Sequence, residues 1–198
     1  MPNLNYLQAL TRSDLSQWVV HFVRGAGLIS PTRMGTAADI LDSIFCEGRI
    51  RPSMHEYVTR FCQEGAACFY DAPPSIWPEI AITNPNQRPP IGIICHKNAL
   101  WALGGRPVIY TDVLDGAAWP EHERFRLVYT DLSRNPQPVD WTHEREWRVR
   151  GGLALTQSFP CIWWWPIVPN YEWLDYLFTK YQSLVSIYVI EENTVVTR

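Results

Sequence analysis

The sequence lacks the features of a secreted or membrane protein. Its first residues have neither the basic start nor the apolar core of a signal peptide. The apolar segment at residues 162–169, IWWWPIVP, is far too short to span a bilayer. We therefore expect a cytoplasmic protein with no membrane association.

Several familiar site motifs are also missing. The five cysteines have no CxxC or finger-type spacing, and the five histidines have no metal-ligand rhythm, so we predict reduced core cysteines and no metal site. Residues 25–27, GAG, lack both the Lys-Ser/Thr ending of a phosphate loop and the GxGxxG spacing. Neither a GxSxG nor an HExxH pattern occurs. A net charge of −3 excludes a global basic field for nucleic acid, although it leaves room for a local basic groove.

What the chain does contain indicates a folded globule. It is 46% hydrophobic with 10 Trp, and its 198 residues suit one domain spanning 1–198. Helical patterns come early and short strand patterns come later, which favours the α+β class over a doubly wound α/β fold.

The expected elements follow from periodicity and punctuation. Helices are predicted over five segments: Ser13 to about Val20, 36–47, 96–103, 120–132 and 171–182. Gly48 is expected to end the second of these helices in a left-handed conformation. Strands are predicted over 21–25, 66–71, 91–95, 107–113 and 183–190.

The segment 140–150, DWTHEREWRVR, is the most informative stretch. If it forms a strand, alternation places Glu144, Glu146 and Arg148 on one face. Two carboxylates about 7 Å apart suit work on a sugar: one holds a ribose hydroxyl and stabilises positive charge, and the other orients an acceptor or water. The alternative is a solvated edge strand bearing a Glu/Arg ladder.

Three separated pieces then form a pattern: His21-Phe22-Val23-Arg24, Cys68-Phe69-Tyr70-Asp71, and Glu144-x-Glu146-Trp147-Arg148. Together with the helix that ends in Gly48-Arg-Ile-Arg51, this set resembles the ADP-ribosyltransferase superfamily, and most closely its bacterial abortive-infection and DarT-type toxin domains. The resemblance implies a split β-sheet core flanked by helices, with NAD as a substrate.

The resemblance also implies roles for individual residues. His21 or Arg24 would hold a ribose of NAD, Phe69 or Tyr70 would line the nicotinamide pocket, and Glu146 would grip the nicotinamide-side ribose. Glu144 would face the acceptor or position water. Arg49 or Arg51 would pair with the pyrophosphate as a charge-assisted fork. The implied site is therefore Glu146 and Glu144 as catalytic residues, with His21, Phe22, Arg24, Arg49, Arg51, Phe69 and Tyr70 as cofactor-binding residues. Tyr70 stands where many members of the superfamily have a serine.

The expected function is an NAD-dependent transferase that modifies a macromolecule, whether protein, DNA or RNA. Two other classes remain open: a non-catalytic NAD- or nucleotide-binding module, and a hydrolase, either an NAD glycohydrolase or a His/Glu nuclease. The resemblance further implies a toxin or phage-defence effector restrained by an antitoxin or regulatory protein. The tryptophans at 163–165 are a candidate contact for that partner, with core packing as the alternative.

Overall fold

The fold is known from a computed structural model that describes residues 16–23, 36–79, 90–112, 116–155 and 164–198. The described chain combines helices with strands in several mixed sheets, which confirms the α+β class. The longest helices are α2 (Thr36–Glu47) and α6 (Tyr171–Lys180). The shorter helical elements are α3 (Glu56–Thr59), α5 (Lys97–Ala102), η1 (Pro74–Ile76), η2 (Gly116–Ala118), η3 (Glu121–Arg126) and η4 (Thr142–Glu144).

The larger sheet has five strands in the order β1-β4-β10-β11-β12. Their bounds are β1 (Trp18–Phe22), β4 (Gly92–His96), β10 (Trp164–Val168), β11 (Ser186–Val189) and β12 (Thr194–Thr197). All neighbouring pairs are antiparallel except β10 with β11. At Gly92 the strands approach so closely that an added Cβ would lie 1.9 Å from the carbonyl oxygen of His21. Glycine therefore permits the β1–β4 pairing at this point.

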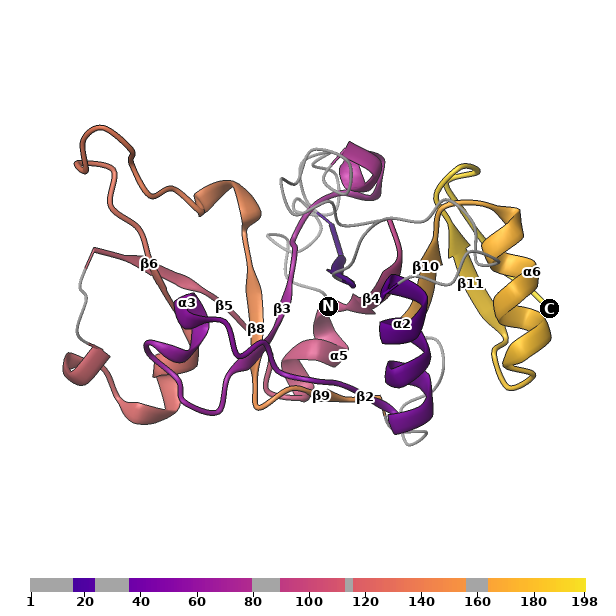
Figure 1. Cartoon of the computed structure of the whole chain (residues 1–198), viewed down its shortest axis with the longest axis horizontal. Coiled ribbons are helices and arrows are strands. Elements are labelled where there is room, and N and C mark those ends of the chain that lie inside the picture. Colours follow the sequence, from indigo (N-terminus) through magenta and orange to yellow (C-terminus); the bar gives the residue numbers. More distant parts are fainter. Residues whose placement is uncertain (1–15, 24–35, 80–89, 113–115, 156–163) are drawn as a thin grey trace, which may run out of the picture.

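A second sheet of three strands has the order β3-β8-β5 and rises through the middle of the molecule in Figure 1. Its strands are β3 (Ala66–Phe69), β8 (Trp147–Arg150) and β5 (Arg106–Pro107). Two smaller pairs complete the described topology: β2 (Arg49–Ile50) with β9 (Leu153–Ala154), and β6 (Ile109–Thr111) with β7 (Leu127–Tyr129). A bridge between Val20 and Tyr70 joins β1 to the end of β3, so the two main sheets meet there.

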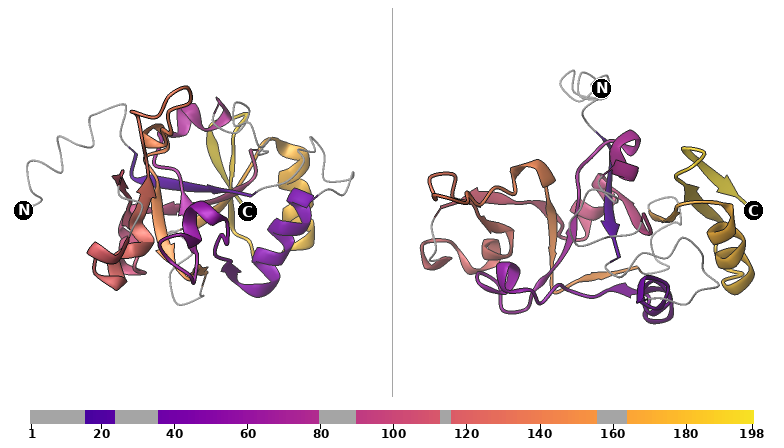
Figure 2. Two further views of the ribbon diagram at one scale, coloured as in Figure 1. Left: turned by 60° about the vertical axis from the view of Figure 1, so that its left-hand side comes forward. Right: turned by 45° about the horizontal axis from the view of Figure 1, so that its top comes forward.

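Helix α2 forms with the predicted bounds. Its apolar stripe is Ile40, Leu41, Ile44 and Phe45, of which Leu41 and Ile44 are buried. Gly48 follows with φ of +61°, the left-handed conformation that ends a helix cheaply in glycine. Figure 2 shows α2 beside α6, on the side of the molecule that carries β11 and β12.

Two apolar clusters hold these layers together. The larger one packs α2 and α6 against residues of both main sheets, including Ile93, Phe69 and Val149. The smaller one lies on the other face of β1 and contains Val20, Phe22, Tyr70, Trp77 and Tyr188. Opposite faces of β1 therefore serve different clusters, as the alternation at His21–Val23 predicts.

Several local predictions are wrong. Residues 18–20 belong to a strand rather than to the end of a helix; residues 1–15, which include the predicted helix start, lie outside the described part. Only Glu121–Arg126 is helical in the segment 120–132, as a 3-10 helix, and Leu127–Tyr129 forms a strand. The predicted strand 107–113 divides into β5 and β6.

Two of the three clustered tryptophans, Trp164 and Trp165, begin strand β10, which the sequence pattern did not reveal. Trp164 packs against the larger apolar cluster, and Trp165 packs against the smaller one. The Trp165 ring lies 4.6 Å from that of Trp18. Packing therefore accounts for these two rings, while Trp163 lies outside the described residues.

Candidate functional site

The three segments that suggested a site lie side by side in the fold. Val20 and Tyr70 exchange backbone hydrogen bonds of 3.0 and 2.8 Å, which joins β1 to the end of β3. Strand β3 in turn pairs with β8, with Cys68 opposite Arg148 and Phe69 opposite Trp147. Residues about 20, 70 and 146 are thus brought to one end of the β3–β8 pair, as the sequence analysis expected.

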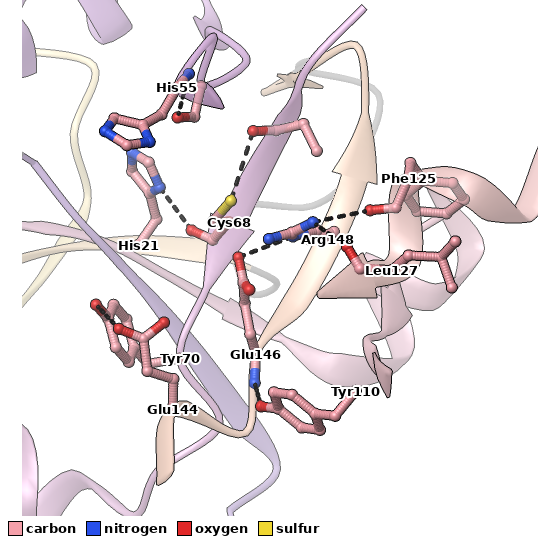
Figure 3. A network of polar contacts seen from close by, with 12 residues as sticks. His21, His55, Cys68, Tyr70, Tyr110, Phe125, Leu127, Glu144, Glu146 and Arg148 are labelled. Atoms are coloured by element: carbon pink, nitrogen blue, oxygen red, sulfur yellow. Dashed lines mark hydrogen bonds and ion pairs between the residues drawn. The ribbon is translucent and has the colours of Figure 1, made fainter. Parts of the chain in front are cut away.

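His21, in the first segment, contacts the second segment. Its Nδ1 is 2.9 Å from the carbonyl oxygen of Cys68 (Figure 3). Its ring centroid is 5.6 Å from that of Phe69. Because a carbonyl only accepts, Nδ1 must carry the proton in this hydrogen bond. In the neutral imidazole Nε2 is then the acceptor nitrogen.

Glu144 does not lie on a strand, so the prediction of one continuous strand through both glutamates is wrong. It ends the 3-10 helix η4, whose start is fixed by a hydrogen bond of 2.9 Å from the Thr142 N–H to Asp140. Arg145 then adopts the left-handed conformation, with φ of 44° and ψ of 47°. This single residue breaks the two-residue period, and β8 begins only at Trp147.

Tyr70 orients the Glu144 carboxylate. Its hydroxyl donates a hydrogen bond of 3.0 Å to Oε1 of Glu144, and Figure 3 shows the two side chains facing each other. Tyr70 is buried against Phe22, with ring centroids 6.0 Å apart, whereas Glu144 is partly exposed. A buried donor directly after β3 thus holds a carboxylate that solvent and ligands can still reach.

Glu146 takes a different direction, into the protein. Its Oε1 lies 3.0 Å from Nε of Arg148, and the two side chains are only 9% and 4% exposed. Arg148 also donates to the carbonyl oxygens of Leu127 at 2.8 Å and Phe125 at 3.4 Å (Figure 3). Burial opposes the charge of Arg148, but the adjacent Glu146 carboxylate holds its pKa above the ordinary value. Glu146 is therefore the counter-ion of a buried arginine.

Tyr110 is a neighbour of both glutamates that the sequence did not indicate. Its hydroxyl oxygen accepts a hydrogen bond of 3.3 Å from the backbone N–H of Glu146. Burial raises the pKa of Tyr110, and the charges of Glu146 and Glu144 raise it further against the opposing effect of that hydrogen bond. The hydroxyl therefore keeps its proton at neutral pH. Nothing in the edge strand around Tyr110 pointed to this contact, because it depends on tertiary packing.

Asp71 is a second residue that the sequence reasoning missed. Its Oδ1 lies 2.7 Å from Lys97 Nζ, an ion pair outside ordinary hydrogen-bond geometry. Its Oδ2 lies 3.3 Å from Nε1 of Trp147 and 3.9 Å from Nη2 of Arg145. Asp71 therefore ties the end of β3 to α5 and to the turn that carries the glutamates. An acidic residue directly after a buried strand was the available signal.

The fold does not bring Arg49 and Arg51 to this end of the sheet. Arg49 donates to the Gly151 carbonyl at 3.1 Å, and Arg51 forms an ion pair with Glu47. The chain that follows β2 reaches the β3–β8 pair at Ala66, through the Ser53–Ala66 bridge. Ala66 is four residues from Tyr70, or about 13 Å along a strand. These arginines therefore make their contacts near the Ala66 end of the β3–β8 pair, away from Tyr70 and Glu144.

Phe69, one of the two residues expected to line the nicotinamide pocket, and Phe22, expected among the cofactor-binding residues, are core residues in this structure. Phe69 is fully buried in the larger apolar cluster, and Phe22 is buried in the smaller one. Neither ring offers a face for stacking on nicotinamide. Arg24 lies outside the described residues.

Comparison of the chain with protein-family models, curated proteins and solved structures finds no match in any of the three. Within the described ranges, no group of three or more His, Cys, Asp or Glu side chains is placed to hold a metal ion. None of the helices in those ranges is long and apolar enough to cross a bilayer.

Proposed function

We propose that this protein is an NAD-dependent ADP-ribosyltransferase-like enzyme that modifies a protein or nucleic acid. The observation that carries the proposal is a pair of hydrogen bonds, from Tyr70 to Glu144 and from His21 to the Cys68 carbonyl, because together they join three segments that are far apart in sequence. The family resemblance assigns those same segments to NAD.

The contacts favour an exchange of the two roles expected for the glutamates. Glu144 is partly exposed and oriented by Tyr70, so it is the carboxylate better placed to meet a substrate. Glu146 is buried against Arg148 and leads into β8. In this proposal Glu144 acts on the ribose. Glu146, paired with Arg148, holds the turn that carries Glu144 in position.

The chemistry requires little more than a well-placed negative charge. The bond between nicotinamide and ribose breaks with its electron pair going to nicotinamide, which leaves as a neutral molecule. The ribose carbon then carries positive charge that Glu144 stabilises. A nucleophile of the acceptor bonds to that carbon and loses its proton. A strong general acid is unnecessary for this leaving group.

The test is incubation of the protein with NAD labelled in the adenosine part, together with cell lysate. Label should enter a protease-sensitive or nuclease-sensitive fraction, which also identifies the acceptor class. Loss of one electrostatic contact to the transition state costs about 10²–10³ in rate, so Glu144→Gln should lower labelling by that factor. Arg150→Gln, which alters a surface ion pair at the other end of β8, is the matched control. Absence of both labelling and nicotinamide release from the wild type would reject the proposal.

A non-catalytic NAD- or nucleotide-binding module is the second candidate. The observation that favours it is the burial of Glu146 against Arg148, since a carboxylate committed to a counter-ion is not available for a ribose. Saturable NAD binding with no nicotinamide release would support this module. Nicotinamide release without any labelled macromolecule would instead identify an NAD glycohydrolase.

The biological setting proposed here is the cytoplasm, in a toxin–antitoxin pair or phage defence with a restraining protein partner. An enzyme that consumes NAD harms its host unless something restrains it. Expression of the wild type alone in a bacterial host should therefore slow growth and lower NAD. Glu144→Gln at equal abundance should be tolerated.

A further inference from the structure

Arg145 has a backbone conformation that its residue type does not favour. Its φ of 44° and ψ of 47° lie in the left-handed region, which is unfavourable for a residue with a side chain and almost free of cost for glycine. The residue stands between the two glutamates of the proposed site. Backbone strain of this kind recurs at functional sites, where the surrounding structure maintains it.

Two cations meet one carboxylate around this turn. Nη2 of Arg145 and Nζ of Lys97 lie 3.9 and 2.7 Å from the two oxygens of Asp71. The formal charge of these three groups is +1, from two cations and one anion. The Lys97 side chain is 19% exposed and that of Arg145 is 40% exposed, so both can meet a ligand.

An aromatic ring lies beside Lys97. Lys97 Nζ lies 5.8 Å from the ring centroid of Trp147, which contacts the Trp101 ring edge-on at 6.3 Å. Arg106 stacks over Trp101 at 3.8 Å and adds a further positive charge. The Trp147 ring reduces the access of water to Lys97 and so strengthens the attraction of this cation for an anion.

The charged cluster of Asp71, Arg145 and Lys97 lies next to the proposed site because two of its members directly follow residues of that site in the chain. Glu144 precedes Arg145, and Tyr70 precedes Asp71, so the Tyr70–Glu144 and Asp71–Arg145 contacts join the same two segments. The arginines expected to hold a pyrophosphate, Arg49 and Arg51, are engaged beyond the other end of β3. Arg145, which follows Glu144, and Lys97 are therefore the two cations that Asp71 holds at this turn.

We propose that Arg145 and Lys97 form an anion-binding site for the diphosphate group of a nucleotide. The identity of the ligand as NAD rests on the proposed function, whereas the affinity for a diphosphate does not. The planar guanidinium of Arg145 binds two phosphate oxygens as a fork, and the Lys97 ammonium adds a point charge. Asp71 holds both cations in place before the ligand arrives.

The test is calorimetric titration of the full chain with NAD, ADP-ribose and inorganic pyrophosphate. Arg145→Gly and Arg145→Asn remove the charge but accept the left-handed backbone, so the turn is kept. Both variants should bind NAD and ADP-ribose about 10- to 100-fold more weakly. Binding should also depend less steeply on salt than in the wild type. Arg150→Gln is the matched control, because Arg150 pairs with Glu64 on the surface at the far end of β8.

Thermal unfolding of each variant separates this role from a structural one, since Arg145→Gly should melt close to the wild type. Unchanged affinity in both Arg145 variants would overturn the anion site and leave the proposed function standing. Weakened binding in Arg51→Gln alone would place the anion site at β2 instead. Arg145-dependent binding of pyrophosphate without binding of NAD would support the anion site and reject the proposed function.

Discussion

Glu146 and Arg148 place two opposite charges where almost no water reaches them. Separating such charges is costly because the charge that remains is left desolvated, and removing one partner of a buried pair typically costs about 3–5 kcal/mol. The pair also fixes β8 to the carbonyl oxygens of Phe125 and Leu127. The main role of the Glu146–Arg148 pair is therefore structural: it holds the turn that carries Glu144.

We expect Glu146→Gln and Arg148→Met each to lower the free energy of unfolding by about 3 kcal/mol, because each leaves a buried group without its partner. The double variant should recover most of that loss, since no uncompensated charge remains. Urea unfolding of the four proteins measures this cycle. Equal losses that simply add in the double variant would show that the pair is not coupled. Glu144→Gln is consequently the cleaner probe of activity.

Helices α2 and α6 are joined by a polar cluster around Asp42. The Asp42 carboxylate accepts hydrogen bonds from Tyr176 at 3.3 Å, from Lys180 and from Tyr181. The hydrogen bond to Asp42 raises the pKa of Lys180 to about 12 from an ordinary 10.5, and burial together with Asp42 raises that of Tyr181. Both groups hold their protons more tightly in the folded chain than in the unfolded chain.

The stability from the raised pKa of Lys180 should be complete below about pH 10 and lost as the pH rises through about 12, and the contribution of Tyr181 falls in the same direction at still higher pH. The unfolded chain releases these protons first, so rising pH favours unfolding. Asp42→Asn should lower the free energy of unfolding by about 1–2 kcal/mol at neutral pH. The variant should also show a shallower decline between pH 10 and 12, measured by urea unfolding at fixed pH. An unchanged slope would mean that other tyrosines dominate the alkaline transition.

At the scale of the whole molecule, one apolar cluster spans both main sheets. It contains Ile93 of the larger sheet, Phe69 and Val149 of the smaller sheet, and residues of α2 and α6. The Val20–Tyr70 bridge adds backbone hydrogen bonds between the sheets. Neither sheet can lose its partner without exposing this shared core.

We therefore expect the chain to unfold as a single domain in one cooperative step. Far-ultraviolet circular dichroism and tryptophan fluorescence should give the same urea midpoint, because one transition exposes both sheets. Two separated midpoints would instead divide the chain into independent units. Destabilising the cluster at Phe69, by Phe69→Leu, should shift both signals together.

The sequence by itself determined the elements whose signals are local. Helix α2 and its Gly48 end follow from the spacing of apolar residues and from the ease with which glycine adopts a positive φ. Strands β3 and β4 follow from short buried runs between turn residues. The α+β class follows from the order of such elements.

Only the tertiary structure decided what the charged and aromatic residues do. The two glutamates are two positions apart in sequence, yet one left-handed residue sends Glu144 to Tyr70 and Glu146 to Arg148. Tyr110 reaches this turn from a strand 36 positions away. Periodicity describes the faces of a regular element, but it carries no information about a turn or about contacts between distant segments. For that reason the sequence pointed to the region of the site, and the fold assigned its partners.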